Sequence, residues 1–314
     1  MRSRACGSLL TALVTGLALL LTLAAMSGGA AAFDLGLTPT AHAYLPYVAR
    51  GHIAATPTPT PTRTPECPTT STHTYSTGTA YQFDTDNPVR RAWNHADKNL
   101  HLRWFSLNTN PGLVRELVNY GNDDPTQPPQ FATLFNPSRV PPLINFYRVY
   151  DWIWRPSPDP GYRGSPITTW PVTAMGLGTT PGEALRVPAS GYDIGGGMEV
   201  LVLYADPDTL ALRYTREDSS GASGYTVHLQ NICTDPNLLA LYNQTDADPG
   251  PRYIYPNHSY PLVNMPAGWH IGWTRGYETI VAIVDSGTFM DTRSCNEWWQ
   301  IRPGYTGSCP PAKQ

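Results

Sequence analysis

The sequence predicts a mainly β, single-domain protein in which antiparallel strands form a sheet or a sandwich, with a few short helices and long Pro/Gly-rich loops. Three strand-like runs follow one another closely, at 198–204, 210–215 and 225–229. Short connections favour antiparallel pairing, because a parallel pair needs a crossover of about a dozen residues or more. The 32 prolines and 27 glycines of the chain supply the turns that such a fold requires.

The first 32 residues have the features of an export signal. Arg2 and Arg4 precede an apolar stretch from Leu9 to Ala25, and small residues follow at 27–32. A charged start, an apolar middle and a small-residue end are the features of a cleaved signal peptide. We therefore expect residues 1–32 to be removed and the protein to be secreted or held at the cell surface. An uncleaved signal is the only membrane contact that the sequence predicts.

Residues 33–76 are expected to form a tether. Threonine alternates with proline between residues 55 and 65. Such a segment cannot pair as a sheet and favours an extended, polyproline-like spacer. The tether would hold the folded region away from a surface or from another module.

The folded region is expected to begin with an irregular part, residues 77–165. One helix is predicted in it over 110–121, since Asn110 can cap its start, Pro111 suits its first turn and Gly121 can end it. Residues 144–154 (INFYRVYDWIW) are predicted to form a strand.

A β-rich core is predicted over 166–303, followed by a C-terminal tail, 304–314. The core contains the three runs described above and a last strand at 278–284 (ETIVAIV). Asp235 precedes Pro236 and is placed to cap a short helix over 237–243.

Charge and cysteine content limit the class of protein. The net charge is −3 and only 14% of residues are charged, which argues against a nucleic-acid partner, because such proteins carry a basic patch. Past the signal an even number of cysteines remains in an oxidising compartment, so we expect two disulfides. Three connectivities are open, and the short interval between the last two cysteines favours Cys295–Cys309. The four cysteines are Cys67, Cys233, Cys295 and Cys309.

A series of short motifs lies between residues 181 and 292. It comprises 181–191 (PGEALRVPASG), 225–229 (YTVHL) and 267–272 (AGWHIG), followed by the last strand. This order resembles the β-domain of the lysostaphin/LytM-type (M23-like) zinc endopeptidases, which cut peptidoglycan cross-links. In that family a Y-x-H-L strand carries a catalytic histidine, and the resemblance matches His228 to it.

The same resemblance implies that the family's metal centre is missing. An H-x-H strand supplies a metal ligand in the family, because a period of two puts both side chains on one face. The matching strand, 278–285 (ETIVAIVD), holds no histidine, and the family's H-x-x-x-D element is also absent. The resemblance therefore favours a non-catalytic relative.

Few residues carry candidate chemistry. If the protein is an enzyme, His228 is the candidate general base, with Glu217 or Asp193 as its acidic partner. His270 has no carboxylate at ligand spacing in the sequence. The sequence accordingly predicts no metal site and no cofactor.

Aromatic side chains are the other candidate site. Exposed aromatic rings stack on sugars and make good contact surfaces. Trp269 and Trp273 each follow a glycine closely in a turn-like segment, and together with Tyr214 they are the candidate ligand-binding residues.

These observations predict a secreted or cell-surface, non-catalytic binding or envelope module for a cell-wall or extracellular glycan or glycopeptide. Two alternatives stay open at this point. One is a secreted hydrolase of peptidoglycan or another glycan that uses His228 with an acid. The other is a structural or adhesion protein of the cell surface.

Overall fold

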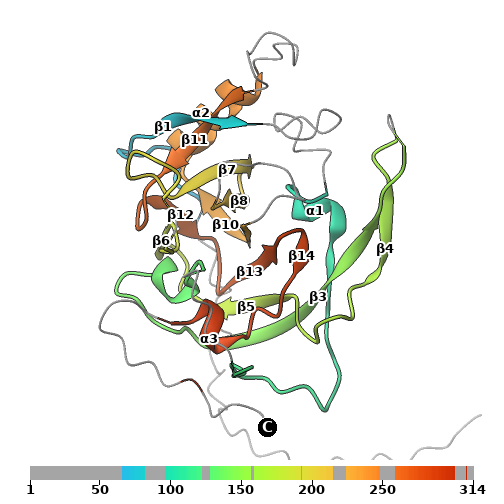
Figure 1. Ribbon diagram of the computed structural model, residues 1–314. Helices are drawn as coiled ribbons and strands as arrows, with labels where there is room; N and C mark the ends of the chain where they lie inside the picture. Colours follow the sequence, from blue (N-terminus) through green and yellow to red (C-terminus); the bar gives the residue numbers. More distant parts are fainter. Residues whose placement is uncertain are drawn as a thin grey trace, which may run out of the picture. The chain divides into compact units, whose positions relative to one another are not determined.

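The computed structural model confirms a mainly antiparallel β-fold with short helices (Figure 1). Its strands form two sheets, one large and one of three strands. The residues that the structure describes are 66–81, 96–121, 128–156, 159–191, 193–214, 224–247, 259–300 and 309. The expected signal peptide and the Thr/Pro-rich stretch lie outside them.

The large sheet has a central path of nine strands, all paired antiparallel, and two further strands beside it. In spatial order the path is β1 (Ser76–Tyr81), β11 (Ser259–Met265), β7 (Val200–Ala205), β8 (Thr209–Arg213), β9 (Tyr225–Gln230), β13 (Glu278–Asp285), β5 (Ala174–Gly178), β3 (Leu143–Ile153) and β2 (Phe105–Leu107). The strands beside the path are β14 (Thr288–Phe289), which pairs with β13, and β4 (Tyr162–Pro166), which pairs with β3.

The second sheet and the helices are short. In spatial order the sheet consists of β10 (Ile232–Thr234), β12 (His270–Thr274) and β6 (Ala184–Arg186). The helices are α1 (Leu100–Arg103), the 3₁₀ helix η2 (Phe131–Leu134), α2 (Pro236–Ala247) and α3 (Cys295–Trp298).

The three closely spaced runs form the predicted meander. β7, β8 and β9 are consecutive neighbours in the large sheet, and β13 follows β9. Alternation sends every second side chain to one face, so Leu212, Val227 and Val281 lie in the main hydrophobic core. Leu185 and Ile271 of the small sheet belong to the same core. The two sheets therefore enclose it in the sandwich-like manner that the sequence predicts.

The opposite face of the meander is also buried. Ala211 pairs with His228, and His228 pairs with Ala282, so these three residues form one row across β8, β9 and β13. Leu100 of α1 and Phe289 of β14 belong to the apolar cluster on this side of the sheet. A strand with both faces covered is apolar almost throughout, as the run in β7 is.

The prediction of a helix over 110–121 is wrong. The Asn110 side chain accepts a bond from the Gly112 backbone N–H and closes a turn. Further along, Val118 donates its N–H to Arg293 O, and Val118 O accepts from Cys295 N, so this backbone pairs in an extended form. Asparagine offers such local bonds in competition with a helix, and here the tertiary pairing prevails. The predicted helix at 237–243 is confirmed within α2.

The expected irregular part, 77–165, supplies β1, β2, β3 and β4 to the large sheet. Folded structure also begins before residue 77. Cys67 is bonded to Cys233, and Ser71 contacts Asp235, so the end of the expected tether packs on the domain. The second disulfide, Cys295–Cys309, is the one that the sequence favours.

We predict that the two disulfides contribute unequally to stability. Cys67–Cys233 spans a sequence separation of 166 residues and Cys295–Cys309 one of 14. A disulfide lowers the conformational entropy of the unfolded chain, more so for a longer loop. Loops of these lengths correspond to about 5 and about 3 kcal/mol in the free energy of unfolding. Urea unfolding of the Cys67→Ser/Cys233→Ser and Cys295→Ser/Cys309→Ser double variants measures both losses. A larger loss for the second double variant would contradict the prediction.

Candidate functional site

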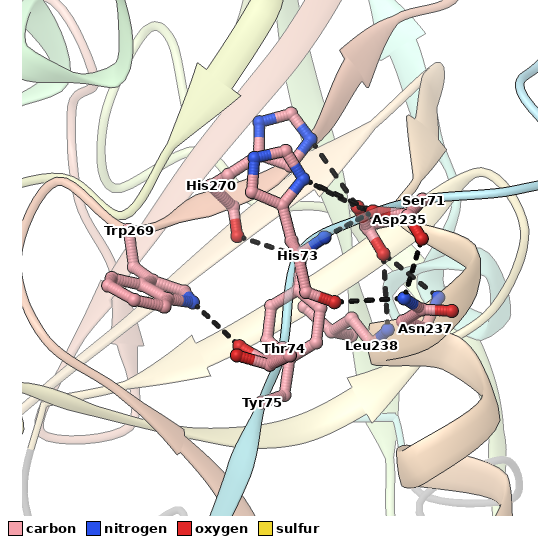
Figure 2. A network of polar contacts seen from close by, with 9 residues as sticks. All are labelled: Ser71, His73, Thr74, Tyr75, Asp235, Asn237, Leu238, Trp269 and His270. Carbon is pink, nitrogen blue, oxygen red and sulfur yellow. Dashed lines mark hydrogen bonds and ion pairs between the residues drawn. The ribbon is translucent and has the colours of Figure 1, made fainter.

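The candidate site lies where three segments meet: residues 67–75, the start of α2, and β12 (Figure 2). The Cys67–Cys233 disulfide ties the first segment to β10. β10 and β12 pair with Thr234 opposite Gly272, and the Asp235 backbone N–H donates to Ile271 O at 3.1 Å. This register brings the residue that follows β10 level with the first residues of β12.

Gly272 permits the close approach of these two strands. Its φ is +149°, and a Cβ at this position would lie 2.2 Å from the carbonyl oxygen of Cys233. The strand register also shifts between His270 and Gly272. A bulge of this kind redirects a side chain, and His270 lies at it.

Asp235 is the centre of the site. Its carboxylate is fully buried. Oδ1 accepts the backbone N–H groups of Asn237 (2.9 Å) and Leu238 (3.4 Å), which caps α2 as the sequence predicts. Oδ2 accepts the Ser71 hydroxyl at 2.6 Å. A carboxylate at a helix start is favoured by the positive end of the helix.

Two histidines face the same carboxylate oxygen. His73 Nδ1 lies 3.4 Å and His270 Nε2 lies 3.6 Å from Asp235 Oδ2. Their rings stack with centroids 4.0 Å apart and planes 18° apart, and Figure 2 shows one imidazole over the other. Trp273 meets the His270 ring edge-on at 4.5 Å. The site therefore gathers two imidazole nitrogens and one carboxylate oxygen.

The protonation of the site follows from burial. Burial, together with the neighbouring charge of His73, lowers the pKa of His270 to about 4, although Asp235 acts in the opposite direction. His270 is thus neutral near pH 7. Burial and the Asp235 carboxylate also raise the pKa of Tyr75, whose hydroxyl donates to His270 O at 3.1 Å. Tyr75 accordingly stays a hydrogen-bond donor.

The arrangement is not that of a serine nucleophile with its base. In a Ser–His–Asp relay the serine and the acid bind opposite nitrogens of the imidazole. Here Ser71 Oγ and Asp235 Oδ2 both lie near Nδ1 of His73, at 3.1 and 3.4 Å. The arrangement suits the binding of a cation better than it suits catalysis by a serine. His73, Asp235 and His270 each offer one ligand atom, and these atoms lie within 4.8 Å of one another.

A second group of three, His101, Asp206 and Asp208, lies at the turn between β7 and β8. His101 Nε2 is 2.6 Å from the Thr209 hydroxyl and 3.2 Å from Asp208. Arg275 also pairs with Asp208, at 2.9 Å. The hydrogen bond to Asp206 raises the pKa of His101. Because Arg275 already neutralises one of the two carboxylates, this group is an ion-pair network.

His228, the candidate general base, is fully buried. Among the described residues neither ring nitrogen has a hydrogen-bond partner, and the ring stacks on Phe289 at 5.9 Å. Burial, and then the charge of Arg103, lower its pKa to about 3. A general base must reach the proton that it removes, and a fully buried ring does not fit this role.

The expected acidic partners do not meet His228 in the described structure. Asp193 is exposed, and its carboxylate accepts the backbone N–H of Gly195 in a turn. Glu217 lies outside the described residues.

The predicted aromatic residues differ in their positions. Trp269 is 40% exposed, and its indole N–H donates to Thr74 O at 3.2 Å, beside the His–Asp site. Trp273 is half-buried against His270. Tyr214 is fully buried in the main core and donates its hydroxyl to Pro188 O, which does not fit a ligand-binding role.

Four residues of the site, Ser71, His73, Asp235 and His270, were not predicted to act together. Residues 71 and 235 are 164 positions apart, and local spacing cannot show such a contact. His270 has no carboxylate at ligand spacing in the sequence, but the fold brings Asp235 beside it. The even cysteine count was a usable signal, because pairing Cys67 with Cys233 places the segment that carries His73 beside the segment that carries Asp235.

Comparisons of the chain with protein-family models, with curated proteins and with solved structures found no match. The resemblance to the lysostaphin/LytM-type β-domain therefore stays a prediction. Across the part of the chain that the structure describes, none of the helices has the length and apolar character needed to cross a membrane.

We predict that His228 makes the protein sensitive to acid. Its folded pKa, about 3, lies below the usual 6.5, so the unfolded chain takes up the proton first. The stability is fully present above pH 6.5 and falls by about 1.4 kcal/mol per pH unit below it. His228→Leu should flatten this slope, as measured by urea unfolding at pH 7, 6 and 5.

His101→Gln is the control, because the raised pKa of His101 has the opposite sign. Its contribution is present below pH 6.5 and is lost as the pH rises through the folded pKa. This variant should therefore lose stability only at the acid end. An unchanged slope in His228→Leu would contradict the prediction.

Proposed function

We propose that this chain is an exported, non-catalytic binding module whose ligand is a cell-wall or extracellular glycan or glycopeptide. The observation that carries the proposal is an exposed aromatic surface on β2, β3 and β4. We call it the aromatic platform and define it by Trp104, Tyr150, Trp152, Trp154 and Arg163. Trp104 is 52% and Trp154 45% exposed.

Strand register brings these residues next to one another. Phe105 pairs with Val149, and Tyr150 donates its N–H to Trp104 O at 3.1 Å, so Trp104 lies level with Tyr150. Trp152 pairs with Arg163 of β4. Because paired residues lie on the same side of a sheet, Trp152 and Arg163 share a face.

The ring contacts agree with this placement. The Arg163 guanidinium lies 6.0 Å from the ring centroids of both Trp104 and Tyr150. Trp154 meets Trp152 edge-on at 6.3 Å. Planar apolar faces next to a guanidinium suit a ligand with sugar rings and an acidic group, because the rings stack and the guanidinium binds the carboxylate.

The backbone of Trp104 is a second supporting observation. Its φ is 65° and its ψ is 173°, a region that is populated almost only by glycine and costs about 1–3 kcal/mol for other residues. A bulky residue held there, half exposed, contributes little to the core. We attribute this strained, exposed tryptophan to contact with a ligand, since strained residues cluster at functional sites.

Export is supported by the two disulfides, which persist in oxidising compartments, together with the signal peptide expected at 1–32. A hydrolase using His228 has no such support. Its proposed base has no exposed surface.

We predict that the aromatic platform binds insoluble glycan. In a pull-down on peptidoglycan and on cellulose, Trp104→Gly and Trp154→Ala should each weaken retention about tenfold or more, as truncated aromatic anchors do. Trp104→Gly should keep its unfolding free energy within about 1 kcal/mol of wild type, because relief of the backbone strain offsets the lost stacking. Retention of both variants at wild-type levels would contradict the proposal.

Trp269→Ala tests the surface favoured by the sequence, and Tyr277→Ala is the matched control. Tyr277 is 65% exposed, lies between β12 and β13, and is not part of the aromatic platform. The Tyr277→Ala variant should bind like wild type. A wild-type protein that stays in the supernatant with every glycan would remove the proposed function.

A further inference from the structure

We propose that His73, Asp235 and His270 form a binding site for a zinc-class divalent cation. The site would join the segment that follows Cys67 to helix α2 and strand β12. This inference is independent of the glycan-binding role, because none of the three residues belongs to the aromatic platform.

Two of the three separations between ligand atoms are close to the edge length of a coordination tetrahedron. Ligand atoms about 2.0–2.1 Å from zinc, at tetrahedral angles, lie roughly 3.3 Å apart. His73 Nδ1 and His270 Nε2 lie 3.4 and 3.6 Å from Asp235 Oδ2. These distances are long for hydrogen bonds, whereas they match two ligands next to a third.

The state of His270 favours ligation. Its Nε2 is buried and has no hydrogen-bond partner among the described residues, and an unpaired buried nitrogen costs free energy. An imidazole with an unused nitrogen that faces a carboxylate is a ready metal ligand.

Asp235 is held in place by bonds that a ligating carboxylate needs. Its Oδ1 is engaged by the first N–H groups of α2, which leaves Oδ2 directed at the two imidazoles. Hydrogen bonds of this kind orient metal ligands and are typical of metal sites in proteins. The Ser71 hydroxyl donates to Oδ2 at 2.6 Å and lies 3.1 Å from His73 Nδ1, so it contacts two of the three ligand atoms.

The donor set selects the metal. Two imidazoles and one carboxylate suit zinc and its transition-metal neighbours, while calcium and magnesium prefer oxygen ligands throughout. The His73 side chain is 41% exposed, whereas that of Asp235 is fully buried. The cation can therefore enter past His73. The site also differs from the peptidase resemblance, which gives His228 as the catalytic histidine and implies no metal centre.

The test is calorimetric titration of the purified, chelator-treated chain, with both disulfides intact, with ZnCl₂ and separately with MgCl₂ and CaCl₂. Wild type should bind one zinc per chain and neither of the other ions. His270→Gln and Asp235→Asn should each weaken zinc binding at least about tenfold. Asn can still accept the bonds that cap α2, so Asp235→Asn removes charge with little change to the helix.

His101→Gln is the matched control, since His101 belongs to the other His/Asp group, where Arg275 already pairs with a carboxylate. It should bind zinc like wild type. Zinc should also raise the melting temperature of wild type and of His101→Gln but not that of His270→Gln, because a ligand stabilises only the state that it binds.

Three results would overturn the proposal. They are no zinc binding by wild type, wild-type affinity for zinc in both His270→Gln and Asp235→Asn, and loss of zinc binding in His101→Gln. If His270→Gln fails to fold by circular dichroism, His73→Gln decides the matter, because His73 is the most exposed of the three ligands. If the His73→Gln variant then binds zinc as tightly as wild type does, the proposal is contradicted.

Discussion

One buried carboxylate joins three distant parts of this protein. Asp235 caps α2 through Oδ1 and receives the Ser71 hydroxyl through Oδ2, while two imidazoles face it from the N-terminal segment and from β12. A buried charge is tolerated only when it is bonded or paired. The position of the N-terminal segment, the start of the helix and the rotamer of His270 are therefore fixed together.

The two faces of the large sheet have different chemistry. One carries aliphatic side chains into the sandwich core. On the other, His228 lies in a row with two alanines, and its ring nitrogens have no hydrogen-bond partner among the described residues. Small neighbours leave room for the imidazole, and burial keeps it neutral. Near neutral pH the buried ring is thus uncharged, and acid destabilises the sheet because protonation of the ring is unfavourable there.

Much of the fold could be predicted from local patterns. Alternation and short turns located the meander of β7, β8 and β9, and Asp235-Pro236 located the start of α2. The error at 110–121 arose because Asn110 caps a turn as readily as a helix, and only the distant partners of Val118, residues 293 and 295, decide between them. Trp104 was not recognised, since its unusual φ depends on how α1 passes into β2.

The candidate site could not be predicted in the same way. His73, Asp235 and His270 each look unremarkable among their neighbours in the sequence, and each depends on pairings with distant strands. The disulfide from Cys67 to Cys233 also has a mechanical consequence. Force applied to the chain at Cys67 would pass through the sulfur–sulfur bond into β10. Ser71, His73 and β1 lie between the two cysteines in the sequence, so such a force would reach β10 without passing along their backbone.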